Sequence, residues 1–255
     1  MIVGIISDAR IDESFGTYSD FWKKIIEGAV CEAEKQNLEI KVFAPKETYD
    51  IKDFPSFLRN VCNSCDAIIM PFSQGSNKLI KILNDFKGPI VFINTPPLKK
   101  WKDKLNKKIP YVGINEFLAG QKIANILLGM GIIESIVVRH EEVDEGHDQR
   151  VLGIRSTKLK VKEIYINLED HKGNKSLRTQ SVLTLGTKGT LFALNNEIPI
   201  IVGMDCNSKV KEAFDDKRIK GILTQNPTKQ GIEAIHLLSH LNLGDYLIEP
   251  MVYIN

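Results

Sequence analysis

The stretch Ile198-Pro199-Ile200-Ile201-Val202-Gly203-Met204-Asp205 decides the fold class. Its uninterrupted apolar run predicts a strand buried on both faces, as in a parallel sheet covered by helices. The run ends at Asp205, just before a predicted helix from Lys209 to Phe214. Open α/β sheets bind ligands at the carboxyl ends of their strands, so Asp205 is the first candidate ligand contact. A turn or helix-capping role is the structural alternative, and it is the commoner role of a single aspartate.

Strand-like and helix-like segments alternate along the rest of the chain. The predicted strands are 2–7, 39–43, 66–70, 89–93, 111–114, 135–139, 162–167, 181–185, 198–204, 219–224 and 251–254. The predicted helices are 19–35, 54–60, 77–85, 118–128, 150–155, 187–195, 209–214 and a last one from 227. This βαβ rhythm predicts an α/β protein of two Rossmann-like lobes with parallel sheets and right-handed crossovers. No low-complexity linker separates the halves, so we expect the chain to cross between the lobes more than once.

The composition of the 255 residues, 43 % hydrophobic and 26 % charged, is typical of a soluble globular protein. A formal net charge of +2 gives no global reason to expect a nucleic-acid or membrane partner. The lysine-rich segment from Lys99 to Lys108 surrounds a single aromatic residue, Trp101, and is interpreted as a solvated surface segment. The amino-terminal residues predict a strand and lack the features of a signal peptide. The chain is therefore either cytoplasmic or a mature or trimmed form.

Motifs for catalysis or metal binding are weak. Cys62 and Cys65 have C-x-x-C spacing, but no second pair accompanies them, and helix-end residues are the preferred interpretation. His140 and His147 lie seven residues apart without the H-E-x-x-H spacing of a zinc helix. The chain contains neither a G-x-x-x-x-G-K-[ST] loop nor a G-x-S-x-G elbow. We therefore expect no enzymatic activity, no metal site and no cofactor.

Polar side chains recur where the predicted strands end. They are Asn94, Asn115 with Glu116, Arg150, Thr187, Asp205 and Gln225. An aromatic cluster that includes Tyr18, Phe21 and Trp22 follows the first strand. Planar hydrogen-bonding groups beside flat apolar faces suit a hydroxylated ring, whose C–H face stacks while its hydroxyls bond.

These segments resemble the type I periplasmic binding proteins, in particular the monosaccharide-type substrate-binding proteins of ABC transporters. The likeness covers nearly the whole chain. The matching motifs are Tyr18-Ser19-Asp20-Phe21-Trp22, Pro89-Ile90-Val91-Phe92-Ile93-Asn94, Tyr111-Val112-Gly113 with Asn115-Glu116, Asp148-Gln149-Arg150 with Gly153, Leu183-Thr184-Leu185-Gly186, Val202-Gly203-Met204-Asp205 and Gln225-Asn226-Pro227. The resemblance implies ligand-binding roles for Tyr18, Asp20, Phe21, Trp22, Asn94, Asn115, Arg150, Thr187, Asp205 and Gln225.

The resemblance also implies an organisation and a mechanism. An N-terminal lobe would comprise residues 1–115 and 226–248, and a C-terminal lobe residues 116–225 and 249–255, with hinges near 114–116, 225–226 and 248–250. A monosaccharide or similar polyol captured between the lobes would close the hinge, and the closed form would dock onto a membrane permease or receptor. The segment between Ile154 and Ser181 is short, with room for only a stunted helix at Lys175 to Thr179, so the second lobe is expected to be reduced.

Two related roles stay open at this stage. The effector-binding core of a LacI-type transcription regulator shares the fold and would be a cytoplasmic dimer. A sensory module of a signalling receptor would use the same cleft to signal. The transporter role predicts a monomer located in the periplasm or anchored by lipid outside the cell, and no nucleic-acid partner is expected.

Overall fold

The computed structural model describes residues 1–7, 17–44, 53–72, 75–140, 145–166, 179–240 and 244–255, with side chains except at residues 17–20 and 140. The chain divides into two compact α/β units. Unit 1 comprises Met1–Gly113 and Asn226–Ile248, and unit 2 comprises Ile114–Gln225 and Glu249–Asn255. Each unit is thus assembled from two stretches of chain, and the chain passes between the units three times.

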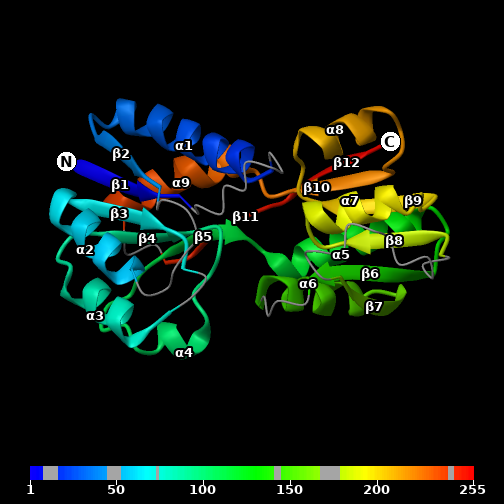
Figure 1. Ribbon diagram of the computed structural model, residues 1–255, viewed down its shortest axis with the longest axis horizontal. Coiled ribbons are helices and arrows are strands. Elements are labelled where there is room, and N and C mark those ends of the chain that lie inside the picture. Colours follow the sequence, from blue (N-terminus) through cyan, green and yellow to red (C-terminus); the bar gives the residue numbers. More distant parts are fainter. Residues whose placement is uncertain (8–16, 45–52, 73–74, 141–144, 167–178, 241–243) are drawn as a thin grey trace. The chain divides into compact units, whose positions relative to one another are not determined.

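Unit 1 is built on a six-stranded sheet of order β11-β5-β4-β3-β1-β2, in which β1 to β5 pair in parallel (Figure 1). Its strands are β1 (Ile2–Ile6), β2 (Glu39–Phe43), β3 (Ala67–Met70), β4 (Ile90–Ile93), β5 (Tyr111–Ile114) and β11 (Tyr246–Ile248). Its helices are α1 (Thr17–Lys35), α2 (Phe54–Ser64), α3 (Asn77–Asp85), α4 (Lys99–Lys102) and α9 (Pro227–Ser239). The last residue of β5, Ile114, already belongs to unit 2.

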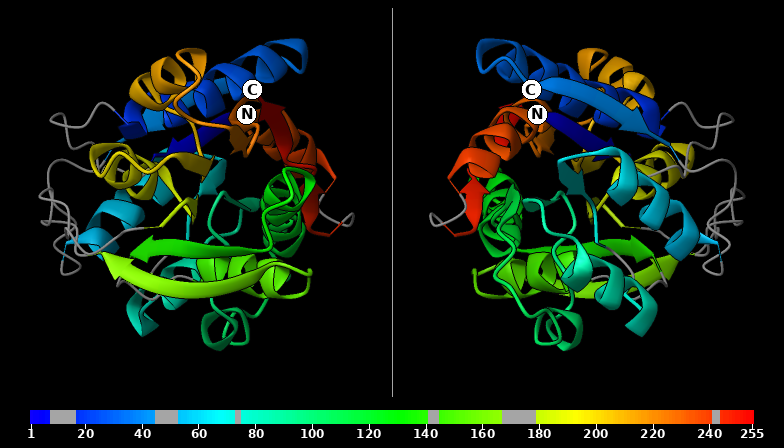
Figure 2. Two further views of the ribbon diagram at one scale, coloured as in Figure 1. Left: turned by 90° about the vertical axis from the view of Figure 1, so that its right-hand side faces the viewer. Right: turned by 90° about the vertical axis from the view of Figure 1, so that its left-hand side faces the viewer.

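The central strands of unit 1 are covered on both faces, which explains their continuous apolar sequences. Alternate residues such as Ile68, Met70 and Phe92 face α2 and α3 and form one core with Leu58 and Leu83. The helices α1 and α9 cover the other side of the sheet (Figure 2).

Helices α1 and α9 pack together through two glycines. A Cβ on Gly28 would collide with the carbonyl oxygen of Thr228, and one on Gly231 would collide with that of Ile25. The two backbones approach this closely only because each helix presents a glycine to the carbonyl group of the other. The pair joins the first helix of the chain to its last, so it holds the returning segment Asn226–Ile248 in unit 1.

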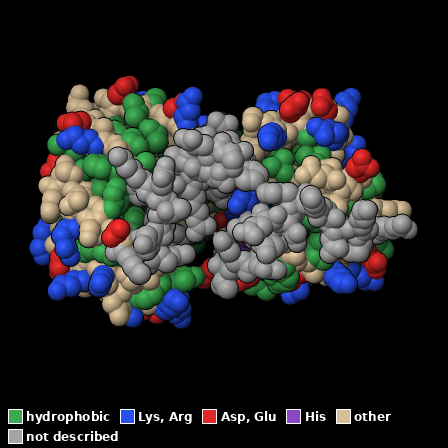
Figure 3. Space-filling model, viewed as in Figure 1, with side chains coloured by type: hydrophobic (Ala, Val, Ile, Leu, Met, Phe, Trp, Pro, Cys, Tyr) green, Lys and Arg blue, Asp and Glu red, His purple; other side chains and the backbone are tan. Residues whose placement is uncertain are grey.

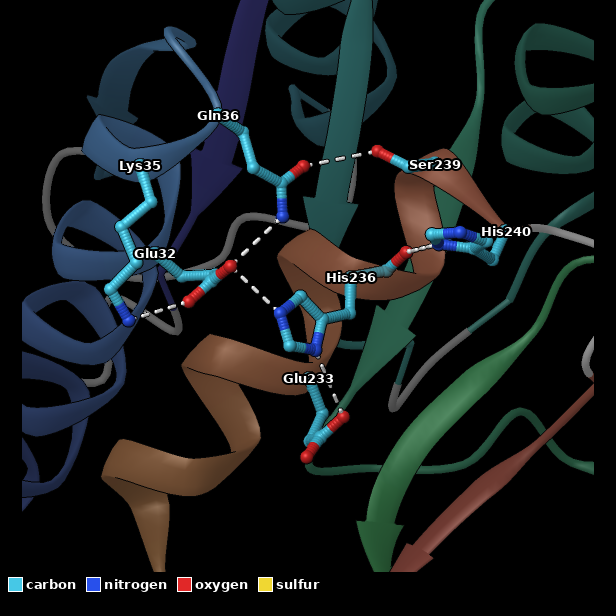
Figure 4. A network of polar contacts seen from close by, with 7 residues as sticks. All are labelled: Glu32, Lys35, Gln36, Glu233, His236, Ser239 and His240. Carbon is cyan, nitrogen blue, oxygen red and sulfur yellow. Dashed lines mark hydrogen bonds and ion pairs between the residues drawn. The ribbon is translucent and has the colours of Figure 1, made fainter.

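A polar network fastens the same two helices (Figure 4). The carboxylate of Glu32 on α1 accepts from Lys35 Nζ at 2.9 Å and Gln36 Nε2 at 3.0 Å, and lies 2.7 Å from His236 Nε2 on α9. Ser239 on α9 donates to Gln36 Oε1 at 3.1 Å. These bonds hold the pKa of Glu32 at about 2, with the hydrogen bonds from Gln36 and Lys35 as the largest causes.

Unit 2 repeats the same plan. Its sheet has the order β12-β10-β9-β8-β6-β7 and is parallel except for β12, which runs antiparallel to β10. Its strands are β6 (Glu134–His140), β7 (Lys160–Ile166), β8 (Ser181–Thr184), β9 (Ile200–Met204), β10 (Gly221–Thr224) and β12 (Met251–Ile254). Its helices are α5 (Glu116–Gly129), α6 (Glu145–Arg155), α7 (Thr187–Asn195) and α8 (Ser208–Asp215).

The core of unit 2 is also divided by its sheet. Val138, Val182 and Ile201 pack with residues of α7 and α8, such as Ala193 and Val210, on one side. Alternate strand residues, such as Val137 and Leu183, are buried on the side of α5 and α6.

Helices α5 and α6 cross as α1 and α9 do. A Cβ on Gly120 would collide with the carbonyl oxygen of Arg150, and one on Gly153 would collide with that of Phe117. This close crossing brings the first turn of α5 to the side chain of Arg150.

The structure confirms the predicted fold class and most elements, with four differences among the helices and strands. Helix α6 begins at Glu145, before its predicted start at Arg150, because the polar run there has no apolar period from which a helix could be predicted. Helix α2 continues to Ser64, past the predicted end at Asn60. The short helix α4 and the short strand β11 were not among the predicted elements. The expectation of a reduced second lobe is wrong for its sheet, since unit 2 has six strands, as many as unit 1. The helix expected at 175–179 lies outside the described residues, except for Thr179.

Among the described helices, none combines the length and the apolar character needed to cross a bilayer.

Candidate functional site

The carboxyl ends of the central strands of unit 2 carry four of the polar residues selected from the sequence. Thr187 follows β8, Asp205 follows β9 and Gln225 follows β10. Because β8, β9 and β10 are neighbours and run in parallel, their carboxyl ends share one edge of the sheet. Arg150, on α6, reaches the same edge through the carbonyl group of Leu185.

Asp205 and Gln225 form a pair at the ends of adjacent strands. Gln225 Nε2 donates to Asp205 Oδ1 at 2.8 Å, and the Asp205 backbone N–H donates to Leu223 O at 2.8 Å. The backbone of Asp205 has a φ of 66°, in the left-handed region that aspartate tolerates better than most residues. Strained backbone of this kind is concentrated at functional sites. Asp205 does not cap the next helix, since Asn207 accepts from the Val210 N–H at 2.7 Å and takes that role.

Arg150 forms a buried bidentate ion pair with Glu116. Its Nε and Nη2 donate to the two carboxylate oxygens of Glu116 at 2.5 and 3.1 Å, and its Nη1 donates to Leu185 O at 2.7 Å. The two side chains are only 6 % and 10 % exposed. The planar guanidinium matches the carboxylate geometry, so the pair fixes the orientation of both groups at the end of β8. Arg150 lies where the sequence expected it, but it is held by a carboxylate of its own unit.

A second arginine fixes the start of α6. Arg139, at the end of β6, is 7 % exposed and donates to Asp148 Oδ1 at 2.6 Å and to Glu163 Oε2 at 3.2 Å. Its guanidinium also lies over the ring of Tyr165 at 5.3 Å. Because Asp148 is in the first turns of α6, this contact ties that helix to the sheet. The helix in turn places His147, which is buried beside Gly186.

The turn between β8 and α7 is packed tightly. The hydroxyls of Thr184 and Thr190 lie 2.6 Å apart, and a Cβ on Gly203 of β9 would be 2.7 Å from Thr190 Oγ1. Gly203 is therefore required where this hydroxyl pair crosses the neighbouring strand. Thr187, at the first position of α7, is half-exposed beside this turn.

Unit 1 places Asn94 at the carboxyl end of β4. Its φ is 63°, its N–H donates to Val112 O at 2.8 Å, and its carbonyl group accepts from the Tyr111 hydroxyl at 2.8 Å. Asn94 and Asp205 thus both have a left-handed backbone at a strand end, but the side chain of Asn94 is a neutral amide and that of Asp205 is a carboxylate.

The aromatic residues of α1 are less accessible than the sequence suggested. Trp22 is 4 % exposed and is a core residue of unit 1, while Phe21 is half-buried. The side chains of Tyr18 and Asp20 lie outside those the structure describes. Of the aromatic side chains of α1 that the structure describes, only Phe21 is accessible enough to stack on a ligand.

Asn115 lies at the amino-terminal end of α5, where it caps the helix. Its Oδ1 accepts from the Leu118 N–H at 2.9 Å. Asn226 has the same relation to α9, where its Oδ1 accepts from the Lys229 N–H at 3.4 Å. The side-chain oxygen of Asn115 is thus engaged in capping, and only its amide nitrogen remains for the predicted ligand role.

Sequence reasoning placed Glu116 with Asn115 among the strand-end groups but gave it no ligand-binding role, and it did not assign His147 to the site. Glu116 is 34 residues from Arg150, so no local spacing announces their pairing. The signal available for Glu116 was its position directly after Asn115, at the end of a predicted strand. His147 had been considered only with His140 as a metal motif.

Cys62 and Cys65 lie at the end of α2, as the sequence predicted, and not at the carboxyl edge of the sheet. Burial raises the pKa of the Cys62 thiol to about 11, and burial also raises that of Cys65. Both are therefore neutral thiols near pH 7, the opposite of an activated redox pair. Among the described residues, no three His, Cys, Asp or Glu side chains are grouped to hold a metal ion.

Comparison with known proteins finds no matching family model and no matching curated protein. Solved structures do match over nearly the whole chain. An ABC transporter periplasmic solute binding protein from Actinobacillus succinogenes with bound D-allose aligns with a TM-score of 0.80 and 15 % identity, covering 99 % of this chain and 97 % of that one. A carbohydrate transporter from Acidothermus cellulolyticus in complex with myo-inositol aligns with a TM-score of 0.72 and 20 % identity, covering 100 % and 94 %.

A putative LacI transcriptional regulator from Bacteroides fragilis aligns equally well, with a TM-score of 0.78 and 14 % identity, covering 99 % of this chain and 96 % of that one. The chain therefore has the fold of the type I periplasmic binding proteins, which the sugar-binding proteins of ABC transporters and the LacI regulators share.

Proposed function

We propose that this protein binds a small polyhydroxylated ligand, a monosaccharide or a cyclic polyol, at the carboxyl edge of the unit 2 sheet. The Asp205–Gln225 pair carries the proposal. A carboxylate and a carboxamide that are hydrogen-bonded at the ends of adjacent strands provide acceptors and donors side by side, which suits neighbouring hydroxyl groups of a sugar ring.

The surrounding groups support the same ligand class. The Arg150–Glu116 pair is oriented before any ligand arrives, so binding would not have to order these long side chains. Thr187 adds a hydroxyl at the start of α7. The ligands named in the titles of similar structures, D-allose and myo-inositol, are polyhydroxylated rings.

We assign the protein to solute capture for an ABC transporter permease. The chain passes between its units three times, near 113–114, 225–226 and 248–249. Rotation about these three segments would allow Asn94 of unit 1 to contact a ligand that is held by Asp205 of unit 2. Contacts made only in this closed form would stabilise it. Effector binding by a LacI-type regulator is the second candidate. A monomer by light scattering, with and without ligand, supports the transporter role, and a stable dimer supports the regulator.

The test is a thermal-shift screen of the wild-type protein over pentoses, hexoses, inositols and linear polyols. A ligand present at about 100 times its Kd stabilises the folded state by about 2.7 kcal/mol, which shifts Tm measurably. The Asp205→Asn variant keeps the side-chain shape but loses the charge, and we expect it to bind the ligand about tenfold to hundredfold more weakly.

Asp216→Asn is the matched control, because Asp216 is an exposed aspartate at the end of α8 in the same unit. Its affinity should equal that of the wild type. A screen in which no sugar or polyol raises Tm would refute the ligand class. Equal affinity of Asp205→Asn and wild type by calorimetry would remove Asp205 from the site.

A further inference from the structure

The positive charge of the chain is concentrated in one segment of unit 1. Residues 77–109 contain nine lysines and two aspartates, a formal charge of +7, in a chain with a net charge of +2. The rest of the chain therefore carries −5. We call the nine lysines of residues 77–109 the basic face.

The structure joins the two halves of this segment into a continuous surface. Asn84 on α3 donates to Lys104 O at 3.2 Å and accepts from the Asn106 N–H at 3.0 Å. Lys104 Nζ donates to Asn77 Oδ1 at 2.9 Å, and Lys107 Nζ donates to Phe86 O at 2.6 Å. The connection that follows α4 thus lies along α3. Figure 3 shows Lys and Arg side chains gathered on the lower rim of the left-hand unit, where Figure 1 places α3 and α4.

Nearby acids balance these charges only in part, since Lys102 forms an ion pair with Asp245 at 3.2 Å while most of the other lysines are exposed. Burial and the charge of Lys87 both lower the pKa of Lys107, so two lysines of the face lie close enough to repel each other. Arg59 of α2 lines the same open recess as Lys78, Lys81 and Lys87. Asp66 and Asp85 also line it, so the recess keeps an excess of positive charge beyond α3. Like charges held together cost stability, so a surface that retains them favours an anionic partner.

The chemistry of the face favours a lipid surface over a protein or a nucleic acid. A protein interface usually has an apolar centre. Among the described residues from 54 to 109, no large apolar side chain is exposed, so the face lacks such a centre. The aromatic ring of Trp101 is packed against Gly75 and covered by Lys100 and Lys104, so it cannot stack on bases. Flexible lysines act as point charges without directional preference, which suits the diffuse charge of a bilayer.

We propose that the basic face docks unit 1 reversibly onto a bilayer rich in anionic phospholipid. Lys87 and Gly88 lie before the amino end of β4, whereas Asn94 lies at its carboxyl end. The contact would therefore leave the carboxyl edge of the sheet accessible. Each lysine near such a surface strengthens binding by a factor of about five, and the attraction weakens as salt screens it.

The test is co-sedimentation of the wild-type protein with vesicles of phosphatidylglycerol and phosphatidylcholine, and with vesicles of phosphatidylcholine alone. We expect retention only on the anionic vesicles, with about tenfold weaker binding when ionic strength is raised from about 0.05 to about 0.2 M. The quadruple variant Lys78→Gln, Lys81→Gln, Lys87→Gln and Lys108→Gln should lose about tenfold or more of this binding.

The matched control replaces four exposed lysines of unit 2 with glutamine, at positions Lys158, Lys162, Lys209 and Lys217. Both variants change the formal net charge from +2 to −2, so only the location of the charge differs. The control should bind within about twofold of wild type, and equal Tm values should show that both variants are folded. Equal loss in the two variants, retention on phosphatidylcholine alone, or equally tight binding to duplex DNA at the same salt would overturn the proposal.

Discussion

The two units share a backbone plan but carry different chemistry on it. The sheet order β2-β1-β3-β4-β5-β11 of unit 1 corresponds to β7-β6-β8-β9-β10-β12 in unit 2. The helix after the first strand of each unit, α1 or α6, crosses a second helix through reciprocal glycine–carbonyl contacts. The second helix follows the fifth strand of the other unit, so α9 comes after β10 and α5 comes after β5.

The polar residues at these corresponding places differ. In unit 1 the crossing is fastened by Glu32 and His236, and the fourth strand ends in the neutral amide of Asn94. In unit 2 the crossing is fastened by the buried Arg150–Glu116 pair, and the fourth strand ends in Asp205. The comparison indicates that the common backbone plan determines the positions at which polar groups can lie. Only in unit 2 are these positions occupied by the charged groups on which ligand recognition is proposed to depend.

The largest effect should come from removing one partner of the charged pair in unit 2. Glu116→Leu leaves the guanidinium of Arg150 buried without its carboxylate, and we expect it to lower the free energy of unfolding by about 3–5 kcal/mol. The measurement is urea denaturation. The double variant Glu116→Leu with Arg150→Met removes both charges and should recover much of the loss.

Glu27→Leu in unit 1 is the control, because Glu27 faces Lys23 on the surface of α1 with its side chain 58 % exposed. This change should cost no more than about 0.5 kcal/mol. If Glu116→Leu cost as little as the control, the idea that unit 2 depends on a buried charged pair would fail.

A smaller effect, equal in the two units, should follow from filling the helix crossings. Gly28→Ala and Gly120→Ala each place a Cβ against a backbone carbonyl oxygen that cannot move without shifting its helix. We expect each to lower the free energy of unfolding by about 1–3 kcal/mol. Similar losses in both variants would support the correspondence between the crossings.

Gly129→Ala is the control, since the space around Gly129 at the end of α5 is open. It should be neutral or stabilise the protein by about 0.5–1 kcal/mol, because alanine favours the helix. A destabilisation by Gly129→Ala as large as that of Gly120→Ala would mean that lost glycine flexibility, and not the close crossing, explains the result.

Much of the frame was predictable from the sequence. The continuous apolar run at 200–204 required a strand covered on both faces, and it fixed the position of Asp205 at a strand end. Ile25, Ala29 and Ala33 are spaced four residues apart within the helix predicted at 19–35, which is the spacing of one helix face, and all three are buried in α1. These predictions succeeded because each depends on a local periodicity that burial enforces.

The pairing of the polar residues could not be predicted in the same way. Arg150 and Glu116 are brought together by the crossing of two helices, and nothing in either local sequence indicates the partner. The burial of Trp22 was missed because an aromatic residue near a strand end suits a ligand site and a core equally well. The start of α6 was missed because it is fixed by the contact between Arg139 and Asp148 and not by an apolar pattern.

The smallest expected effect is the pH dependence of the free energy of unfolding that comes from the Glu32 network in unit 1. The hydrogen bonds from Gln36 and Lys35, together with His236, hold the pKa of Glu32 at about 2, below its ordinary value of 4.5. A carboxylate with a lowered pKa contributes stability that is present above its ordinary value and is lost as the pH falls to its value in the folded state. The free energy of unfolding of the wild type should therefore fall between about pH 4.5 and about pH 2 more steeply than that of Glu32→Gln.

The expected result is a pair of stability curves that lie apart near neutral pH and approach each other below about pH 4.5, measured by urea denaturation at a series of pH values. Glu27→Gln, on the exposed surface of the same helix, leaves the network intact and should follow the wild-type slope. Parallel curves for Glu32→Gln and wild type would show that Glu32 is not ionised against its neighbours in the folded state. The crossing in unit 1 would then depend on its glycines alone, and the two units would differ more than their common frame suggests.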